Sequence, residues 1–342
     1  MSTIKIIARK AGVSPTTVAN VLHGNDRRVS PATREKVQAI IREEKYAPNM
    51  GAIILAHSNS RIIGVIMFME PRRNETVLED PFSSAILGAM EREIRDNGYF
   101  LMLHTTSDEN EVLHLSKAWK LDGLVLVWVP GDICRIISGS IDTPLVYIDC
   151  YFTDNKHVYY NIGLQDQRGG YEIARHLLSM GHTDIAFLAN NPLFSGGDPA
   201  RFNGCQKAFQ EQGLSLTQNS YIPLPKDRHE RESLYGQLGA EGSPYTALIF
   251  SADYYAAEAI LCLQENGVEV PGQISVTGFD DNIFSRMVRP RLTTVHQDSG
   301  EKGRLAISML MKLIRKEKVG EADVRLPVRL EIRDSVRRLR ES

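Results

Sequence analysis

The sequence predicts a small all-α head followed by an α/β body of two doubly wound lobes. Two Ser-Pro pairs, at 14–15 and 30–31, mark helix starts near the N-terminus, since serine caps helices and proline suits their first turn. From Ile62 onward, short apolar strands alternate with helical patterns, which is typical of a parallel sheet covered on both faces. Residues 61–342 are too many for one such sheet, so we expect two lobes.

Three short helices are expected in the head, over about 3–10, 14–22 and 30–45. Thr3 can cap the first helix, and Gly12 ends it. Two helices joined by a tight turn form a helix-turn-helix, whose second helix enters the major groove of DNA. A generic three-helix module is the alternative that this pattern leaves open. The expected core of the head consists of Ala8, Val13, Val18, Val21 and Leu22.

The body alternates strands with helices, several of which end at a glycine. Strands are expected at 62–67, 100–103, 123–129, 145–148, 185–189, 247–250 and 274–278. Helices are expected at about 82–97, 166–180, 201–212 and 253–266. Pockets in such folds form at the carboxyl ends of strands and between lobes.

The composition is that of an ordinary globular protein, with 42% hydrophobic and 24% charged residues among 342. The longest apolar runs, Ile62–Met69 and Gly123–Val129, are far shorter than the roughly 18 residues of a membrane span. The N-terminus has no apolar signal core. We therefore expect a cytoplasmic protein with no membrane contact.

Cysteine spacing and motif content argue against a disulfide framework, a metal site or an enzyme. The four cysteines contain no C-x-x-C pair and are expected to be reduced thiols. The sequence has no P-loop, no G-x-G-x-x-G after a strand and no G-x-S-x-G. We expect no catalytic residues, no metal and no cofactor. The cysteines are Cys134, Cys150, Cys205 and Cys262.

Charge is unevenly distributed along the chain. Residues 1–60 contain nine Lys and Arg and four Asp and Glu, a net charge of +5. Because the whole chain carries −2, residues 61–342 carry −7. A basic head on an acidic body is consistent with a module that binds a polyanion.

Residues Thr3–Val18, Val29–Arg34 and Lys45–Asn49 resemble the start of the lactose-repressor (LacI/GalR) family of bacterial transcription regulators. Segments of the body follow in the order of that family, so the resemblance covers about residues 3–335. These segments are Asp80–Phe82, Asn97–Tyr99, Asp122–Leu124, Gly181–Leu188, Gly278–Asp281 and Pro290–Val295.

The resemblance implies a helix-turn-helix domain at 1–48, a hinge helix and linker at 49–60, and a body like a periplasmic sugar-binding protein. In such a body the chain crosses between the lobes three times. The N-lobe would comprise 61–161 and 292–321, and the C-lobe 162–291 and 322–342. The family implies homodimers on near-palindromic double-stranded operators, with a small effector between the lobes. The tail after Asp334 has no leucine heptad that would assemble tetramers.

By motif position, the base-reading residues would be Pro15, Thr16 and Asn20. Asn20 stands where relatives commonly carry arginine, and asparagine suits adenine rather than guanine. Asn20 could instead lie on a solvated face, and Pro15 could only start its helix. Phosphate contacts are expected from helix-terminal N–H groups and three hydroxyls. These hydroxyls belong to Ser14, Thr17 and Ser30.

The connector after the head matches the hinge helix of the family. Ala52 and Leu55 are expected to contact DNA, with Leu55 as a wedge that enters a central base step from the minor groove. Gly51 weakens this helix, and Ile53 replaces a usual polar residue. The prediction is therefore a hinge that is more apolar than usual.

Effector-binding positions of the family map onto residues suited to a polyhydroxylated ligand. Carboxylates accept hydrogen bonds from hydroxyls, an arginine donates to oxygens, and aromatic faces cover a sugar ring. Trp128 could instead belong to the core, Arg201 to a surface ion pair, and Asp280 to a cap. The expected residues are Phe82, Ser83, Trp128, Asp149, Arg201 and Asp280, with Gln297 nearby.

Two departures from the family affect the effector site. Ala252-Asp253 replaces the usual Asn-Asp pair, and Ser83 replaces a phenylalanine. Asp253 is expected to cap the following helix. These changes leave a phosphorylated sugar or a non-sugar open as the effector.

The sequence therefore predicts a dimeric DNA-binding regulator, a repressor by family habit, that is controlled by a small effector such as a sugar. A sugar-binding protein and an effector-independent DNA-binding regulator are the alternatives.

Overall fold

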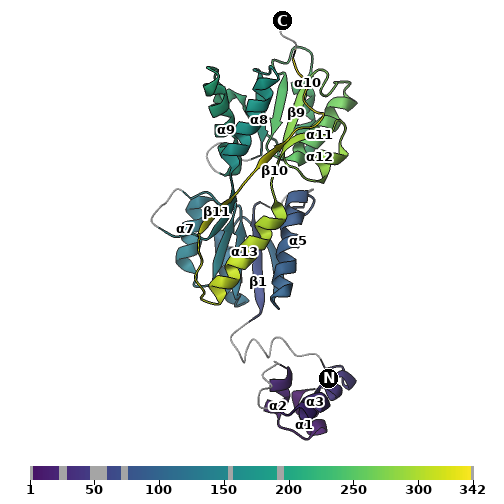
Figure 1. The fold of residues 1–342 in the computed structure, drawn as a ribbon, viewed down its shortest axis with the longest axis vertical. Coiled ribbons are helices and arrows are strands. Elements are labelled where there is room, and N and C mark those ends of the chain that lie inside the picture. Colours follow the sequence, from purple (N-terminus) through teal and green to yellow (C-terminus); the bar gives the residue numbers. More distant parts are fainter. Residues whose placement is uncertain are drawn as a thin grey trace. The chain divides into compact units, whose positions relative to one another are not determined.

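The computed structural model describes residues 3–22, 29–46, 60–70, 76–152, 157–190 and 196–339. The chain divides into two compact units, residues 1–60 and residues 61–342. Figure 1 shows the helical first unit and the second unit with its two layered α/β lobes. The predicted fold class is confirmed in both units.

The head contains three helices, α1 (Ile4–Ala11), α2 (Pro15–Leu22) and α3 (Pro31–Glu43). Gly12 makes the turn between α1 and α2 with a φ of 69°, a conformation that glycine adopts without strain. The core of the head includes the five residues expected from the sequence. Its buried members are Ile7, Ala8, Ala11, Val18, Val21 and Val37, with Val13 and Leu22 packed against them.

Both Ser-Pro pairs start helices in the predicted way. The Oγ of Ser14 accepts a hydrogen bond from the backbone N–H of Thr17 at 3.1 Å. The Oγ of Ser30 accepts one from the N–H of Thr33 at 3.2 Å. Each cap satisfies a backbone donor that the first helical turn leaves without a partner.

The N-lobe is built on a six-stranded sheet in the order β11-β5-β4-β3-β1-β2. All of its strand pairs are parallel. Its strands are β1 (Ile62–Phe68), β2 (Phe100–Thr106), β3 (Gly123–Val127), β4 (Leu145–Ile148), β5 (Asn161–Leu164) and β11 (Asp323–Leu326). Its helices are α5 (Pro81–Asp96), α6 (Glu109–Ala118), α7 (Gly131–Ser140) and α13 (Ser299–Ile314).

The C-lobe is built on a second six-stranded sheet in the order β12-β10-β9-β8-β6-β7. Only β12 runs antiparallel to its neighbour. The strands are β6 (Ile185–Ala189), β7 (Tyr221–Pro223), β8 (Ala247–Phe250), β9 (Ser275–Asp280), β10 (Thr293–His296) and β12 (Arg329–Glu331). The helices are α8 (Asp166–Ser179), α9 (Gly197–Glu211), α10 (Arg228–Gly239), α11 (Asp253–Glu265) and α12 (Ile283–Met287), with a short 3-10 helix at Gln218–Ser220.

The chain crosses between the lobes three times, at positions slightly different from those expected. β5 and β11 belong to the N-lobe sheet, and β10 belongs to the C-lobe sheet. The crossings therefore follow 164, 296 and 326, a few residues after the expected boundaries at 161, 291 and 321. The reason is that these short strands pair at or near the sheet edges, and edge pairing is not visible as a change in sequence pattern.

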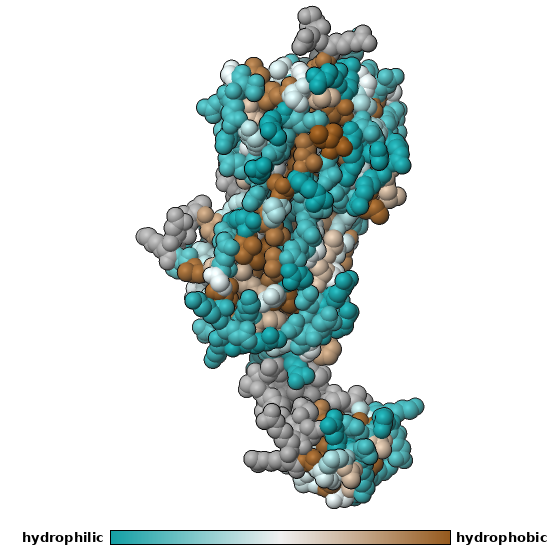
Figure 2. All heavy atoms as spheres, in the orientation of Figure 1, coloured by the Kyte–Doolittle hydropathy of each residue, from teal (hydrophilic) through white to brown (hydrophobic). Residues whose placement is uncertain are grey.

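The segment of the last crossing packs apolar side chains against the cores of the lobes. Leu326, in β11, packs against cores of both lobes, and Val328 and Leu330 pack against the C-lobe core. Figure 2 shows apolar side chains along the face that β11 and β12 cross. This tail is thus part of both lobes.

All four cysteines are free and buried. Among the residues that the structure describes, no helix has the length and apolar character needed to cross a membrane.

Candidate functional site

The predicted DNA-contacting residues of the head lie at helix starts and along α2. Pro15 and Thr16 are exposed in the first turn of α2, and Asn20 lies half-buried one turn later. The hydroxyl of Thr17 is 3.0 Å from the Oγ of Ser14. Ser30 is exposed at the start of α3. Ala52 and Leu55, with the expected hinge helix, lie outside the described residues.

In the body, three predicted effector residues occupy the carboxyl ends of strands in a strained backbone conformation. Trp128 follows β3 with a φ of 62°, Asp149 follows β4 with a φ of 51°, and Asp280 ends β9 with a φ of 121°. Side chains other than glycine rarely adopt these angles, and such strain is concentrated at functional sites. The carboxyl edge of both sheets is therefore the candidate site.

Asp149 forms a buried ion pair that the sequence did not predict. The ammonium Nζ of Lys302, in α13, donates to Oδ1 and Oδ2 of Asp149 at 2.8 Å each and to Oε1 of Gln297 at 2.9 Å. The Lys302 side chain is 1% exposed, and that of Asp149 is 13% exposed. Burial raises the pKa of Asp149, and the Lys302 charge opposes that rise. All three N–H donors of Lys302 are used.

The polar chain continues into the C-lobe through Gln297. The Nε2 of Gln297 donates to Oδ1 of Asp280 at 2.5 Å. Gln297 lies in the crossing between β10 and α13, so hydrogen bonds run from the N-lobe residues Asp149 and Lys302 to the C-lobe residue Asp280. Burial, followed by the charges of two neighbouring carboxylates, raises the pKa of Asp280.

Arg201, in α9, is held by a second set of buried contacts. Its Nε donates to Oδ1 of Asp166 at 2.8 Å, and its Nη1 donates to the carbonyl oxygen of Ser251 at 2.5 Å. The guanidinium carbon lies 3.6 Å from the ring centroid of Phe279. The hydroxyl of Tyr151 also donates to Asp166. Burial disfavours the Arg201 charge, yet its pKa is raised because the carboxylates around it outweigh that penalty.

These groups form one electrostatic unit, here named the inter-lobe cluster. The charge of Arg201 acts on both Asp149 and Asp280, and the charge of Asp166 acts on Asp149. A pocket of about 390 Å³ lies beside it, lined by Tyr151, Leu164 and Arg325 of the N-lobe and by Asp166 and neighbouring residues of the C-lobe. The inter-lobe cluster consists of Asp149, Asp166, Arg201, Asp280, Gln297 and Lys302.

The predicted aromatic residues flank the cluster, whereas Ser83 does not extend it. The rings of Phe82 and Trp128 have centroids 6.1 Å apart, and the Nζ of Lys302 lies 5.1 Å from the Phe82 centroid. Ser83 is fully buried, and its hydroxyl donates to Oδ2 of Asp80 at 2.8 Å as part of the cap of α5. The hydroxyl of Ser83 therefore serves helix capping.

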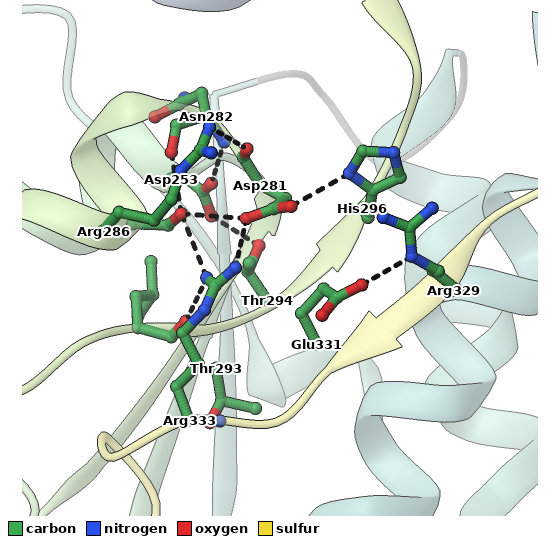
Figure 3. A network of polar contacts seen from close by, with 12 residues as sticks. Asp253, Asp281, Asn282, Arg286, Thr293, Thr294, His296, Arg329, Glu331 and Arg333 are labelled. Carbon is green, nitrogen blue, oxygen red and sulfur yellow. Dashed lines mark hydrogen bonds and ion pairs between the residues drawn. The ribbon is translucent and has the colours of Figure 1, made fainter.

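Asp253 does not cap α11 with its side chain, contrary to the expectation. Its Oδ1 accepts from the hydroxyl of Thr294 at 2.6 Å, and its Oδ2 accepts from the N–H of Asn282 at 2.9 Å. These bonds tie α11 to β10 and to the segment after β9 (Figure 3). Burial raises the pKa of Asp253 to about 7.

The same network fixes the residues next to Asp280 and Gln297. Asp281 accepts a hydrogen bond from Arg333, and its Oδ2 lies 2.9 Å from Nδ1 of His296 (Figure 3). Asp281 directly follows Asp280, and His296 directly precedes Gln297. The network therefore positions the ends of β9 and β10 that contribute to the inter-lobe cluster.

Lys302 and Asp166 are the main residues that sequence reasoning missed. Lys302 shares its helix face with Ala306 and Met309, at the spacing of a buried stripe. A lysine within such a stripe is an available signal, since lysine is almost never fully buried without a partner. Among the described residues, no group of three or more His, Cys, Asp or Glu is arranged to hold a metal ion.

Comparison with known proteins agrees with this architecture. The model for bacterial regulatory proteins of the lacI family matches residues 3–49, and that for a periplasmic binding protein-like domain matches 174–336. The HTH-type transcriptional repressor PurR of Pasteurella multocida (strain Pm70) is 31% identical over 98% of this chain and 99% of the relative. This chain belongs to the lacI family.

Two further proteins illustrate the match. The HTH-type transcriptional regulator GalR of Escherichia coli (strain K12) is 31% identical over 86% of this chain and 84% of the relative. A crystal structure of the lac repressor dimer bound to operator and the anti-inducer ONPF superposes with a TM-score of 0.84 at 26% identity, covering 98% of this chain and 99% of that chain. The chain is therefore a DNA-binding transcriptional regulator with an effector-binding core, and not an enzyme.

Proposed function

We propose that this lacI-family regulator represses transcription as a homodimer on a near-palindromic operator, and that a small polyhydroxylated effector, a sugar or sugar derivative, sets its operator affinity. The observation that carries the proposal is the inter-lobe cluster, in which Asp149 of the N-lobe is connected to Asp280 of the C-lobe through Lys302 and Gln297. A ligand that bonds to both ends of this chain couples its binding to the relative position of the lobes.

Hydrogen-bond capacity favours a ligand rich in donors. Lys302 uses all three N–H groups within the protein, and Arg201 uses Nε and Nη1. The carboxylates of Asp149 and Asp280 can accept further bonds, because an ionised carboxylate has about four acceptor positions. Hydroxyl groups supply the donors that such carboxylates accept, and the rings of Phe82 and Trp128 offer apolar faces.

Operator binding is assigned to the head. Exposed Pro15 and Thr16, with Asn20 one turn later, occupy the N-terminal part of α2, the part of a recognition helix that contacts base edges. Ser14 and Ser30 cap two helix N-termini, whose N–H groups and dipoles suit phosphate. The lac repressor structure that this chain resembles is a dimer bound to operator, which supports the same arrangement here.

The proposal is tested by selecting bound duplexes from a random DNA pool with the full chain at two salt concentrations. We expect a palindrome whose affinity falls steeply with salt, because each phosphate contact releases counterions. The selected operator is then titrated with the full chain in the presence of neutral, aminated and phosphorylated sugars. At least one compound is expected to change operator affinity about tenfold or more, a typical allosteric coupling.

Two outcomes would contradict the proposal. Enrichment of no sequence at either salt concentration would remove operator binding. A palindrome whose affinity no small molecule changes would favour an effector-independent regulator.

A further inference from the structure

The inter-lobe cluster contains three carboxylates and two cations. Lys302 pairs with Asp149, and Arg201 pairs with Asp166. The third carboxylate, Asp280, receives its described hydrogen bond from the neutral amide of Gln297. Among the described residues, Asp280 is therefore the carboxylate of the cluster with no cation within ion-pair distance, and the charge of Arg201 acts on it only from farther away.

The surroundings of Asp280 favour a cation. The residue is 7% exposed, and its pKa is raised first by burial and then by the carboxylates of Asp253 and Asp80, while Arg201 opposes the rise. A buried carboxylate among other carboxylates takes up a proton unless a positive charge joins it, and a cation beside Asp280 would lower its pKa and hold it ionised. A positively charged group of the ligand would supply the cation that Asp280 lacks within the protein.

The net charge of the body also favours a cationic ligand. Residues 61–342 carry a formal charge of −7. A field of this sign raises the local concentration of cations and lowers that of anions near the site. It disfavours a phosphorylated effector, which would also meet the carboxylates of the cluster.

We propose that the effector carries a protonated amine that forms an ion pair with Asp280, which makes it a small hydroxylated amine such as an amino sugar. This inference rests on the proposed function, because it concerns the effector of the same site. The amine takes the place next to Asp280, and the hydroxyl groups of the ligand donate to the remaining acceptors of the cluster. The amine thus distinguishes this effector from a neutral sugar of the same shape.

The test measures binding of matched probes to the full chain at pH 7 by isothermal titration calorimetry. Glucosamine, galactosamine and mannosamine are each compared with the parent hexose, the N-acetyl derivative and the hexose 6-phosphate. We expect one of the amines to bind about tenfold or more tightly than its neutral and phosphorylated counterparts, the effect of one hydrogen bond to a charged group.

Asp280→Asn is the matched variant. Asparagine keeps the shape of the carboxyl group, retains an oxygen to accept from Gln297 and tolerates a positive φ. We expect this variant to lose the preference for the amine, so that amine and hexose bind within about twofold of each other. The control is Asp96→Asn, the same change at an exposed carboxylate at the end of α5, which should keep the full preference.

Binding of a hexose or a hexose 6-phosphate as tightly as the amine would overturn the inference and leave the proposed function standing. An amine preference that survives Asp280→Asn would also overturn it. Failure of the proposed function itself would give a different result. If no probe binds and a small-metabolite fraction leaves operator affinity unchanged, the proposed function fails and the inference fails with it.

Discussion

The ammonium nitrogen of Lys302 lies 2.8 Å from each carboxylate oxygen of Asp149, although the two residues are 153 positions apart. This ion pair joins α13 to the carboxyl end of β4 on the side of the N-lobe that meets the C-lobe. Because Lys302 also donates to Gln297, its charge stabilises both an effector-site carboxylate and one of the three lobe crossings. The lysine is thus a positioning residue for the inter-lobe cluster.

Lys302→Met should lower the free energy of unfolding by about 3 kcal/mol, because it leaves Asp149 buried without its cation. The double variant Lys302→Met/Asp149→Asn removes both charges and should recover most of this loss, since asparagine also fits the positive φ at position 149. Urea unfolding of the full chain measures both values. Equal stability of the single variant and the natural chain would show that the pair contributes nothing net.

Arg201→Ala should abolish the effector response and lower the free energy of unfolding by about 3 kcal/mol, because Asp166, 2% exposed, loses its cation. Arg201→Lys keeps a positive charge near Asp166 but lacks the planar fork that reaches Ser251 as well. We expect the lysine variant to fold with a smaller loss and still respond weakly. Effector-dependent operator titration beside urea unfolding separates these effects. A full effector response from folded Arg201→Ala would assign the arginine to folding alone.

Asn20→Ala should change which base is preferred at one symmetric position of each operator half-site. The loss of discrimination should be about 1–3 kcal/mol, the value of a bidentate side chain–base contact. Competition binding with duplexes substituted at each position measures it. Lys5→Ala, on the exposed face of α1, is the control and should weaken binding to all sequences equally. An equal weakening from Asn20→Ala would contradict its role as a base reader.

The sequence was sufficient for elements whose signal is local. Ser14 and Ser30 predict the starts of their helices because a serine cap bonds to a residue only three positions away. Both caps form as expected. Gly12 likewise marks its turn through its own backbone freedom. The short strands β5, β10 and β11 were not delimited, because three or four residues contain too little alternation and their identity depends on pairing with distant strands.

In the candidate site, too, some residues could be predicted from the sequence and others depend on contacts between distant parts of the chain. Asp149, Arg201 and Asp280 were placed by family motifs, and they lie in one cluster at the meeting of the lobes. Lys302 and Asp166 neutralise two of these residues, and their ion-pair partners could not be assigned because pairing across 153 and 35 positions follows from tertiary structure alone. Asp253 was expected to cap its own helix, yet the fold brings Thr294 and the N–H of Asn282 to its carboxylate.

Asp253 makes the stability of the body depend on pH. Its pKa is about 7 in the folded chain and 3.8 in the unfolded chain, since burial outweighs the bonds from Thr294 and Asn282. The folded state therefore binds the proton more tightly. The proton on Asp253 therefore stabilises the folded state fully below about pH 4. This stabilisation is lost as the pH rises through 7, and the free energy of unfolding falls by at most about 1.4 kcal/mol for each pH unit.

Asp253→Asn mimics the protonated carboxyl group and should flatten this dependence. Urea unfolding of the natural chain and the variant at unit steps from pH 4 to 8 measures the difference. We expect the variant to gain stability relative to the natural chain as the pH rises to 7, with no further gain above it. Asp334→Asn is the control, because Arg291 lowers the pKa of this exposed carboxyl and its effect should be constant above pH 5. Parallel curves for Asp253→Asn and the natural chain would mean that Asp253 stays ionised over this range and that its hydrogen bonds outweigh its burial.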